Sequence, residues 1–133
     1  MRRMIVAFLV LMIVGMCVGA LPADAAHAPT VVLSQTTGVV NGQKLIAQGA
    51  HWIPGSVVDG TECSPQFVNV GLVACNRPFE NIASATGRIR TKIEVHTGSV
   101  GSAGYGCRTK CLVVFYERDD TAMSAYAKFT FAA

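Results

Sequence analysis

Four of the five cysteines stand in two close pairs, and this spacing limits the folds that the chain can adopt. Cys63 and Cys75 bracket a short apolar loop, and Cys107 and Cys111 form a tighter pair. Paired cysteines in an exported chain are typical of disulfides. Four cysteines allow three pairings, and the local spacing favours 63 with 75 and 107 with 111. Closing the first loop would stabilise the fold by about 3 kcal/mol.

The N-terminus has the three parts of a secretory signal peptide. Two arginines precede an apolar run over residues 4–21, and the small-residue sequence Ala-Asp-Ala-Ala follows at 23–26. A membrane anchor is the alternative, because the run reaches the length of a short transmembrane span. Pro22 and an Ala-x-Ala site follow it at once, without a positive cluster, which favours cleavage. We expect a signal peptide over residues 1–25 and one domain over residues 26–133, with no stable membrane anchor.

The charge of the mature chain is close to neutral. Removal of residues 1–25 takes away Arg2, Arg3 and Asp24, so 11 Lys+Arg become nine and 8 Asp+Glu become seven. The resulting net charge of +2 is too small to indicate a nucleic-acid-binding protein by itself.

Short apolar, β-branched segments separated by Gly-rich turns predict an all-β sandwich of antiparallel strands. The strands are expected at residues 30–34, 44–48, 56–62, 88–95, 112–116 and 126–131. Loops are expected at 49–55, where Trp52 and Ile53 would cap the core, around Pro78-Phe79, and at 96–106, and a polar turn at 117–123. Asp59-Gly60, inside one expected strand, is by local rules a turn signal. No helix face is evident after residue 25.

The segment 88–95 has the clearest alternation. Ile89, Thr91, Ile93 and Val95 share one face, and Arg88, Arg90, Lys92 and Glu94 share the other. The basic side chains form a stripe that could contact phosphates, but no aromatic residues interleave with it. We interpret it as a solvated outer face.

Several motifs resemble those of one protein family. They are Ala28-Pro29-Thr30, the turn Thr37–Gly42, the loop Gly49–Gly55, Asp59-x-x-x-Cys63, Gly71-Leu-Val-Ala-Cys-Asn76 and the late pair Cys107/Cys111. Over residues 28–131 the chain resembles the neocarzinostatin-type apoproteins, the secreted carriers of enediyne chromophores. The resemblance implies a seven-stranded immunoglobulin-like sandwich with two disulfides.

The resemblance also implies a function. Such apoproteins hold a labile hydrophobic molecule in a cleft without a covalent bond, and the chromophore, rather than the protein, attacks DNA. We therefore expect a secreted or cell-envelope carrier, active in antimicrobial defence, with a hydrophobic small-molecule partner and no other cofactor. It would be a monomer and would meet DNA only through its ligand. The alternative is an exported immunoglobulin-like interaction module that has lost chromophore binding.

The family's cleft positions map onto this chain residue by residue. Phe79 would stack on the ligand, Asp59 and Glu62 would form a polar edge, and the strand after Cys111 would form the floor. The full set of implied ligand-binding residues is Asp59, Glu62, Phe67, Leu72, Val73, Phe79, Leu112, Val114 and Tyr116. Two departures are visible: the segment 96–105 is shorter than in the family, and Val114 replaces a small residue and would fill part of the cleft.

Catalysis has little support in the sequence. His27, His51 and His96 lack metal-ligand spacing, and Glu94 with His96 is best explained as a surface pair. No nucleophile elbow and no phosphate-binding loop is present. We expect neither an enzyme nor a metal site.

Overall fold

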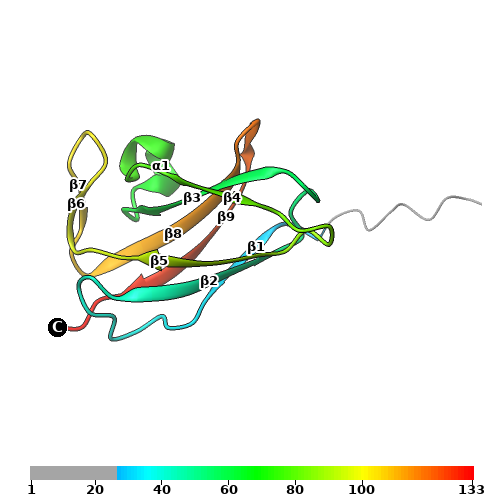
Figure 1. Ribbon diagram of the computed structural model, residues 1–133. Coiled ribbons are helices and arrows are strands. Elements are labelled where there is room, and N and C mark those ends of the chain that lie inside the picture. The colour runs from blue at the N-terminus through cyan, green and yellow to red at the C-terminus, as the bar shows by residue number, and fades with distance from the viewer. Residues whose placement is uncertain (1–26) are drawn as a thin grey trace, which may run out of the picture.

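Two antiparallel sheets pack face to face in the computed structural model, which describes residues 27–133 (Figure 1). The expected signal peptide lies outside the described residues. One sheet has the strand order β1-β2-β5 and the other the order β4-β3-β8-β9, while β6 and β7 form a separate hairpin. The elements are β1 (Thr30–Leu33), β2 (Lys44–Ala50), β3 (Val57–Cys63), α1 (Phe67–Val70), the 3₁₀ helix η1 (Gly71–Ala74), β4 (Phe79–Ile82), β5 (Ile89–Glu94), β6 (Gly98–Val100), β7 (Tyr105–Cys107), β8 (Lys110–Glu117) and β9 (Asp120–Thr130).

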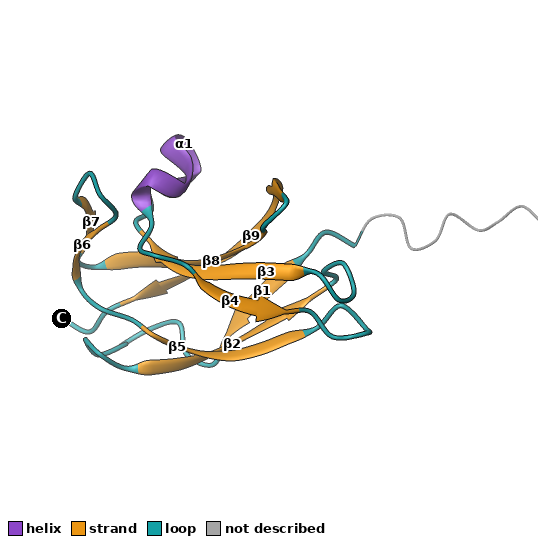
Figure 2. Cartoon of the chain, turned by 45° about the horizontal axis from the view of Figure 1, so that its top comes forward, coloured by secondary structure: helices purple, strands orange, loops and turns teal. Residues whose placement is uncertain are grey.

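The two sheets confirm the predicted all-β fold class. Within residues 27–133 they contain three and four strands, which is the seven-stranded immunoglobulin-like sandwich implied by the resemblance. Both expected disulfides are formed, Cys63 with Cys75 and Cys107 with Cys111. The short hairpin β6-β7 and the helical segment lie outside these sheets, on one side of the four-stranded sheet (Figure 2).

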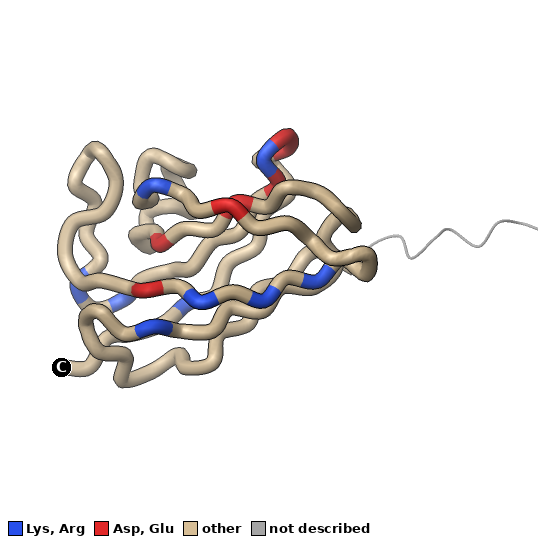
Figure 3. Tube along the Cα trace, viewed as in Figure 1, with Lys and Arg blue, Asp and Glu red and all other residues tan. Residues whose placement is uncertain are grey.

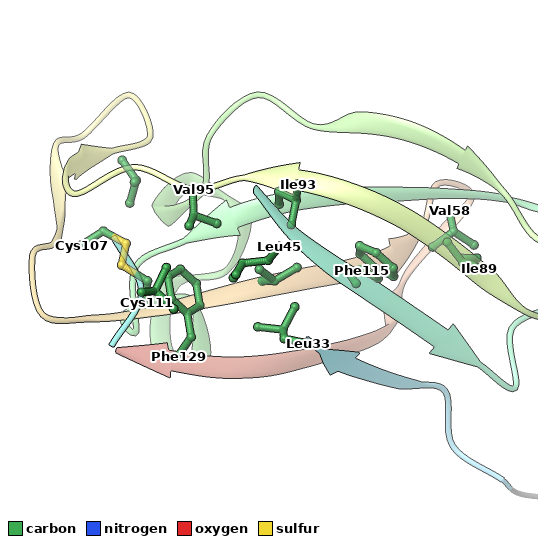
Figure 4. Packing of buried hydrophobic residues seen from close by; sticks show 14 of the residues in the cluster. Leu33, Leu45, Val58, Ile89, Ile93, Val95, Cys107, Cys111, Phe115 and Phe129 are labelled. Atoms are coloured by element: carbon green, nitrogen blue, oxygen red, sulfur yellow. A yellow bond between two sulfur atoms is a disulfide. The ribbon is translucent and has the colours of Figure 1, made fainter. Parts of the chain in front are cut away.

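The main core lies between the sheets and follows the strand alternation that the sequence predicts (Figure 4). Leu45 from β2 and Ile93 from β5 meet Phe115 from β8 in this cluster. Trp52 caps one end, and its indole Nε1 donates to the Thr30 carbonyl at 3.3 Å. Ile53 is 51% exposed, so the expectation that it also caps the core is wrong.

Strand β3 runs straight through Asp59-Gly60, where local rules predict a turn. Asp59 pairs with Tyr116 and Gly60 with Phe115 across the β3–β8 ladder. The turn signal is overridden because Gly60 makes room for an aromatic ring: a Cβ there would lie 2.6 Å from Phe115 Cε1. Tertiary packing therefore decides the conformation at this position.

Residues 96–106, predicted as a loop, contain most of the hairpin β6-β7. The hairpin packs against the end of η1, since Gly101 N–H donates to Asn76 Oδ1 at 3.3 Å. Gly101 has φ of 75°, and a Cβ there would lie 2.3 Å from the Val73 carbonyl oxygen. Only glycine fits this turn without displacing the neighbouring backbone.

The polar turn predicted at 117–123 is shorter in the structure. Strand β8 continues to Glu117 and β9 begins at Asp120, so the turn itself consists of Arg118 and Asp119. The long β9 is what brings Tyr126 and Lys128 beside β8.

Residues 67–74 form two consecutive helical turns, which the sequence analysis did not predict. Phe67 N–H donates to the Ser64 carbonyl and Val70 N–H donates to the Gln66 carbonyl, at 2.9 and 3.0 Å. Gly71, with φ of 75°, ends the first turn. None of the helices within residues 27–133 has the length and apolar character that crossing a bilayer requires.

Candidate ligand-binding groove

Strand β8 separates two apolar clusters because its side chains alternate between the faces of the sheet. Cys111, Val113 and Phe115 enter the main core between the sheets. Leu112, Val114 and Tyr116 point to the outer face, where they belong to a second cluster. All six side chains are buried, so both faces of this central strand are covered.

The cover on the outer face is the helical segment α1-η1, which the Cys63–Cys75 disulfide closes into a loop. Cys63 and Cys75 belong to the second cluster, and Phe67 from α1 packs against it. Two backbone hydrogen bonds beside the disulfide, Ser64 N–H to the Ala74 carbonyl and Asn76 N–H to the Glu62 carbonyl, are each 2.9 Å long. The segment is therefore attached to the sheet at both of its ends.

An apolar groove of about 470 Å³ lies beside this segment, over the outer face of β8 and β9. Its lining residues are Pro65, Val68, Lys110, Cys111, Leu112, Tyr126, Lys128, Phe129 and Thr130. Val68, 56% exposed, and Tyr126, 42% exposed, offer apolar surface to a ligand. The volume falls within the range of small-molecule sites, about 300–1,000 Å³.

Two comparisons relate the chain to known proteins. The sequence is 32% identical over 79 residues to macromomycin from Streptomyces macromomyceticus, covering 58% of this chain and 54% of that sequence. The solved structure of macromomycin superposes with a TM-score of 0.61 at 26% identity, covering 79% of this chain and 100% of that one.

The chain resembles the neocarzinostatin-type apoproteins in sequence and in fold. Its sequence match spans only about half the length of macromomycin. The solution structure of apokedarcidin is also similar, at 18% identity and a TM-score of 0.47, covering 78% of this chain and 96% of that one. No model of a protein family matches the chain.

Four of the residues that the neocarzinostatin resemblance implies are brought together on the outer face: Phe67, Leu112, Val114 and Tyr116. Leu112 lines the groove itself. Phe67 lies edge-on to Tyr126, with the ring centroids 6.2 Å apart. Val114 is fully buried under the helical segment and fills the space between the strand and its cover.

Leu72 and Val73, which the resemblance implies as ligand-binding residues, do not line the groove. Both lie on η1 and are exposed to solvent. The Val73 carbonyl oxygen packs against the turn of the hairpin β6-β7 at Gly101.

Phe79 is the residue whose placement differs most from the expectation. It begins strand β4, where a loop was predicted, and pairs with Gly60 on β3. Its ring packs against the main core, edge-on to Phe115 with the centroids 6.5 Å apart. The ring faces inward because Gly60 has no side chain, and it is therefore not available for stacking in the groove on the outer face.

The two carboxylates expected at one polar edge lie on opposite faces of the sheet. Asp59 shares the outer face with Tyr116, and the Arg118 guanidinium is hydrogen-bonded to it. Burial raises the pKa of the Tyr116 phenol, with the Asp59 carboxylate adding to the rise and Arg118 opposing it. Neither Asp59 nor Tyr116 lines the groove.

Glu62 lies on the inner face, at the end of the sandwich. Its carboxylate accepts the His96 backbone N–H at 3.0 Å and the Asn76 side-chain amide at 3.4 Å. Burial raises the pKa of Glu62 to about 7, against the opposing effect of the His96 hydrogen bond. Its oxygens approach the sulfurs of Cys107 and Cys111, but these are bonded to each other, so the group is a structural brace rather than a metal-ligand set.

Sequence reasoning missed several of the groove residues, including Val68, Tyr126, Lys110 and Lys128. The β8–β9 register sets Tyr126 opposite Val114 and Lys128 opposite Leu112. The turn at Arg118-Asp119 does not indicate this register, because the ladder shifts between Glu117, which pairs with Asp120, and Tyr116, which pairs with Ser124.

Proposed function

We propose that the protein is a secreted carrier that holds a hydrophobic small molecule, without a covalent bond, in the groove over β8 and β9. The observation that carries this proposal is the groove itself, an apolar hollow of about 470 Å³ beside a disulfide-closed segment. The similarity to macromomycin, one of the chromophore-binding apoproteins, supports the same conclusion.

The chemistry of the lining suits storage rather than catalysis. Within residues 27–133, the groove lining contains no carboxylate and no histidine, so it holds no acid–base pair. Its one cysteine, Cys111, is bonded to Cys107 and is not a nucleophile. A bound ligand would be shielded from water by Leu112 below and by Val68 and Tyr126 beside it.

The resemblance to the neocarzinostatin-type apoproteins suggests the kind of ligand, the relation to DNA and the biological role. The ligand would be an enediyne-like or other labile chromophore that acts on DNA, and the protein would contact DNA only through it. The biological role would be antimicrobial defence by a protein exported through its signal peptide. Two disulfides within one small domain support an oxidising, extracellular location.

A titration with the neutral fluorophore N-phenylnaphthylamine tests the carrier function. We expect saturable binding by wild-type protein, and binding about tenfold weaker in Tyr126→Ser, which removes an aromatic contact and its apolar area. The control is Ile82→Ser, which replaces an exposed apolar residue on the edge strand β4, outside the groove. Absence of binding by wild type, or equal binding by both variants, would contradict the proposal. Native mass spectrometry of protein from its own host would then identify the natural ligand.

The alternative function, an exported interaction module, is favoured by one specific observation. Val114, at the position where the family has a small residue, is fully buried, and Phe79 is turned into the main core. Part of the family's cleft is therefore filled in this chain. If the module hypothesis holds, neither wild-type protein nor Val114→Gly will bind the neutral fluorophore, and Val114→Gly will only lose stability.

A further inference from the structure

Two lysines lie at one end of the groove, and the strand register sets them close together. Lys110 on β8 pairs with Thr130, and Lys128 on β9 pairs with Leu112, so the lysines are diagonal neighbours on one face. Such neighbours have Cα atoms about 7–8 Å apart. Both side chains line the groove, and each can reach a single group bound between them.

No carboxylate neutralises these two charges. Within residues 27–133, neither Lys110 nor Lys128 takes part in an ion pair, and none of the groove-lining residues is acidic. The carboxylates of the ion pairs belong to Asp59, Glu80 and Glu94, which are paired with Arg118 or His96. Figure 3 shows the acidic residues along β3–β5 and at the tip of the β8–β9 turn.

The floor and walls next to the lysines are apolar. Leu112 is buried, and Val68 and Tyr126 expose hydrocarbon and aromatic surface toward the groove. A ligand that fits this combination has an apolar ring system at one end and a negative charge at the other. A neutral ligand would leave the two ammonium groups beside it without a partner.

We propose that the groove selects an apolar ligand that carries an anionic group, a carboxylate, sulfonate or phosphate, held between Lys110 and Lys128. This inference rests on the proposed carrier function and adds the charge class of the ligand. The two ammonium groups bind the anion from adjacent strands, while Leu112, Val68 and Tyr126 contact the rings. Two ion pairs at this exposed site together contribute about a tenfold gain in affinity.

Two fluorophores of similar ring structure test the charge class: anilinonaphthalene sulfonate, which is anionic, and N-phenylnaphthylamine, which is neutral. Both are titrated into folded wild-type protein, the double variant Lys110→Met/Lys128→Met and the control Lys44→Met/Lys92→Met. The control removes the same net charge from the opposite sheet, where both residues are exposed. Methionine retains the apolar stem of lysine, and near-ultraviolet circular dichroism confirms that each variant is folded.

We expect the groove double variant to bind the sulfonate at least about tenfold more weakly than wild type does. Its affinity for the neutral fluorophore should stay within about twofold of the wild-type value. The control should bind both fluorophores as wild type does. Added salt should lower the affinity for the sulfonate but not for the neutral fluorophore. Equal sulfonate binding by wild type and the groove variant would overturn the charge inference and leave the carrier function standing. Failure of the wild type to bind either fluorophore would overturn both.

Discussion

Arg118 holds the buried carboxylate of Asp59 through two parallel hydrogen bonds, from Nε to Oδ2 at 3.1 Å and from Nη2 to Oδ1 at 2.8 Å. The third guanidinium nitrogen, Nη1, contacts Glu80 at 2.9 Å. These two carboxylates raise the pKa of Arg118, chiefly through the hydrogen bonds. One cation at the start of the β8–β9 turn therefore joins β3, β4 and the turn.

The first prediction compares the two partners of Arg118. Arg118→Met should lower Tm clearly, because it leaves the Asp59 carboxylate buried without its hydrogen-bond donor. Glu80→Gln should change Tm much less, because the Glu80 carboxylate is half exposed and its ion pair is weakened by water. Thermal melts of both variants at neutral pH measure the difference. Equal shifts in Tm would show that the hydrogen bonds to Asp59 add no stability beyond that of the Glu80 ion pair.

A second prediction concerns the close packing at Gly60. A Cβ at this position would lie 2.6 Å from Phe115 Cε1 and 2.8 Å from Phe79 Cζ, so both rings would have to move. Gly60→Ala should destabilise the fold by about 1–3 kcal/mol. Gly106→Ala, also in a strand but with open space around its Cβ, is the matched control and should be neutral or slightly stabilising. Urea denaturation of both variants measures the two free energies, and an unaffected Gly60→Ala would refute the packing argument.

The raised pKa of Glu62 predicts a pH dependence of stability. Between its ordinary pKa of 4.5 and its folded value of about 7, the native state binds the proton that the unfolded state has released. The free energy of unfolding should therefore fall as pH rises through this window, by on the order of 3 kcal/mol in total. Glu62→Gln keeps an acceptor for the His96 N–H and should remove most of this slope. Denaturation at closely spaced pH values from 4 to about 8 checks both statements, and a wild-type slope of the opposite sign would contradict them.

The last prediction concerns the two disulfides. Their sequence separations are 12 and 4 residues, so the chain-entropy model assigns about 3 kcal/mol to Cys63–Cys75 and about 2 kcal/mol to Cys107–Cys111. Replacing Cys63 and Cys75 by serine should also weaken binding of the neutral fluorophore, because Val68 lies on the segment that this disulfide closes. Replacing Cys107 and Cys111 should affect binding less. Equal affinity in both double variants would show that the segment keeps its position without the covalent bond.

Much of the sandwich was predictable because alternation along a half-buried strand is a local property. Ile89 and Ile93 were expected inside, and both are buried in the main core. The inward turn of Phe79 was not predictable, because it depends on pairing with Gly60, nineteen positions earlier in the sequence. The helical turns at residues 67–74 were missed for a similar reason: the disulfide and the ladder beside it close this segment over the sheet.

The candidate site was predictable only in part. Leu112, Val114 and Tyr116 were placed correctly on one face because they alternate along one strand. Asp59 and Glu62 were assigned to a common edge, although a separation of three residues puts them on opposite faces of a strand. Lys110 and Lys128 were missed because their proximity arises from the β8–β9 register.

The alternation along β8 separates the residues of the groove from those of the main core. Residues 111, 113 and 115 face the main core, and residues 110, 112, 114 and 116 face the side on which the groove lies. Lys110, Tyr126 and Lys128 are exposed, so substitutions there would alter the lining of the groove without changing the main core. Under the proposed carrier function, single replacements at these positions would change which ligand binds while the main core stays intact.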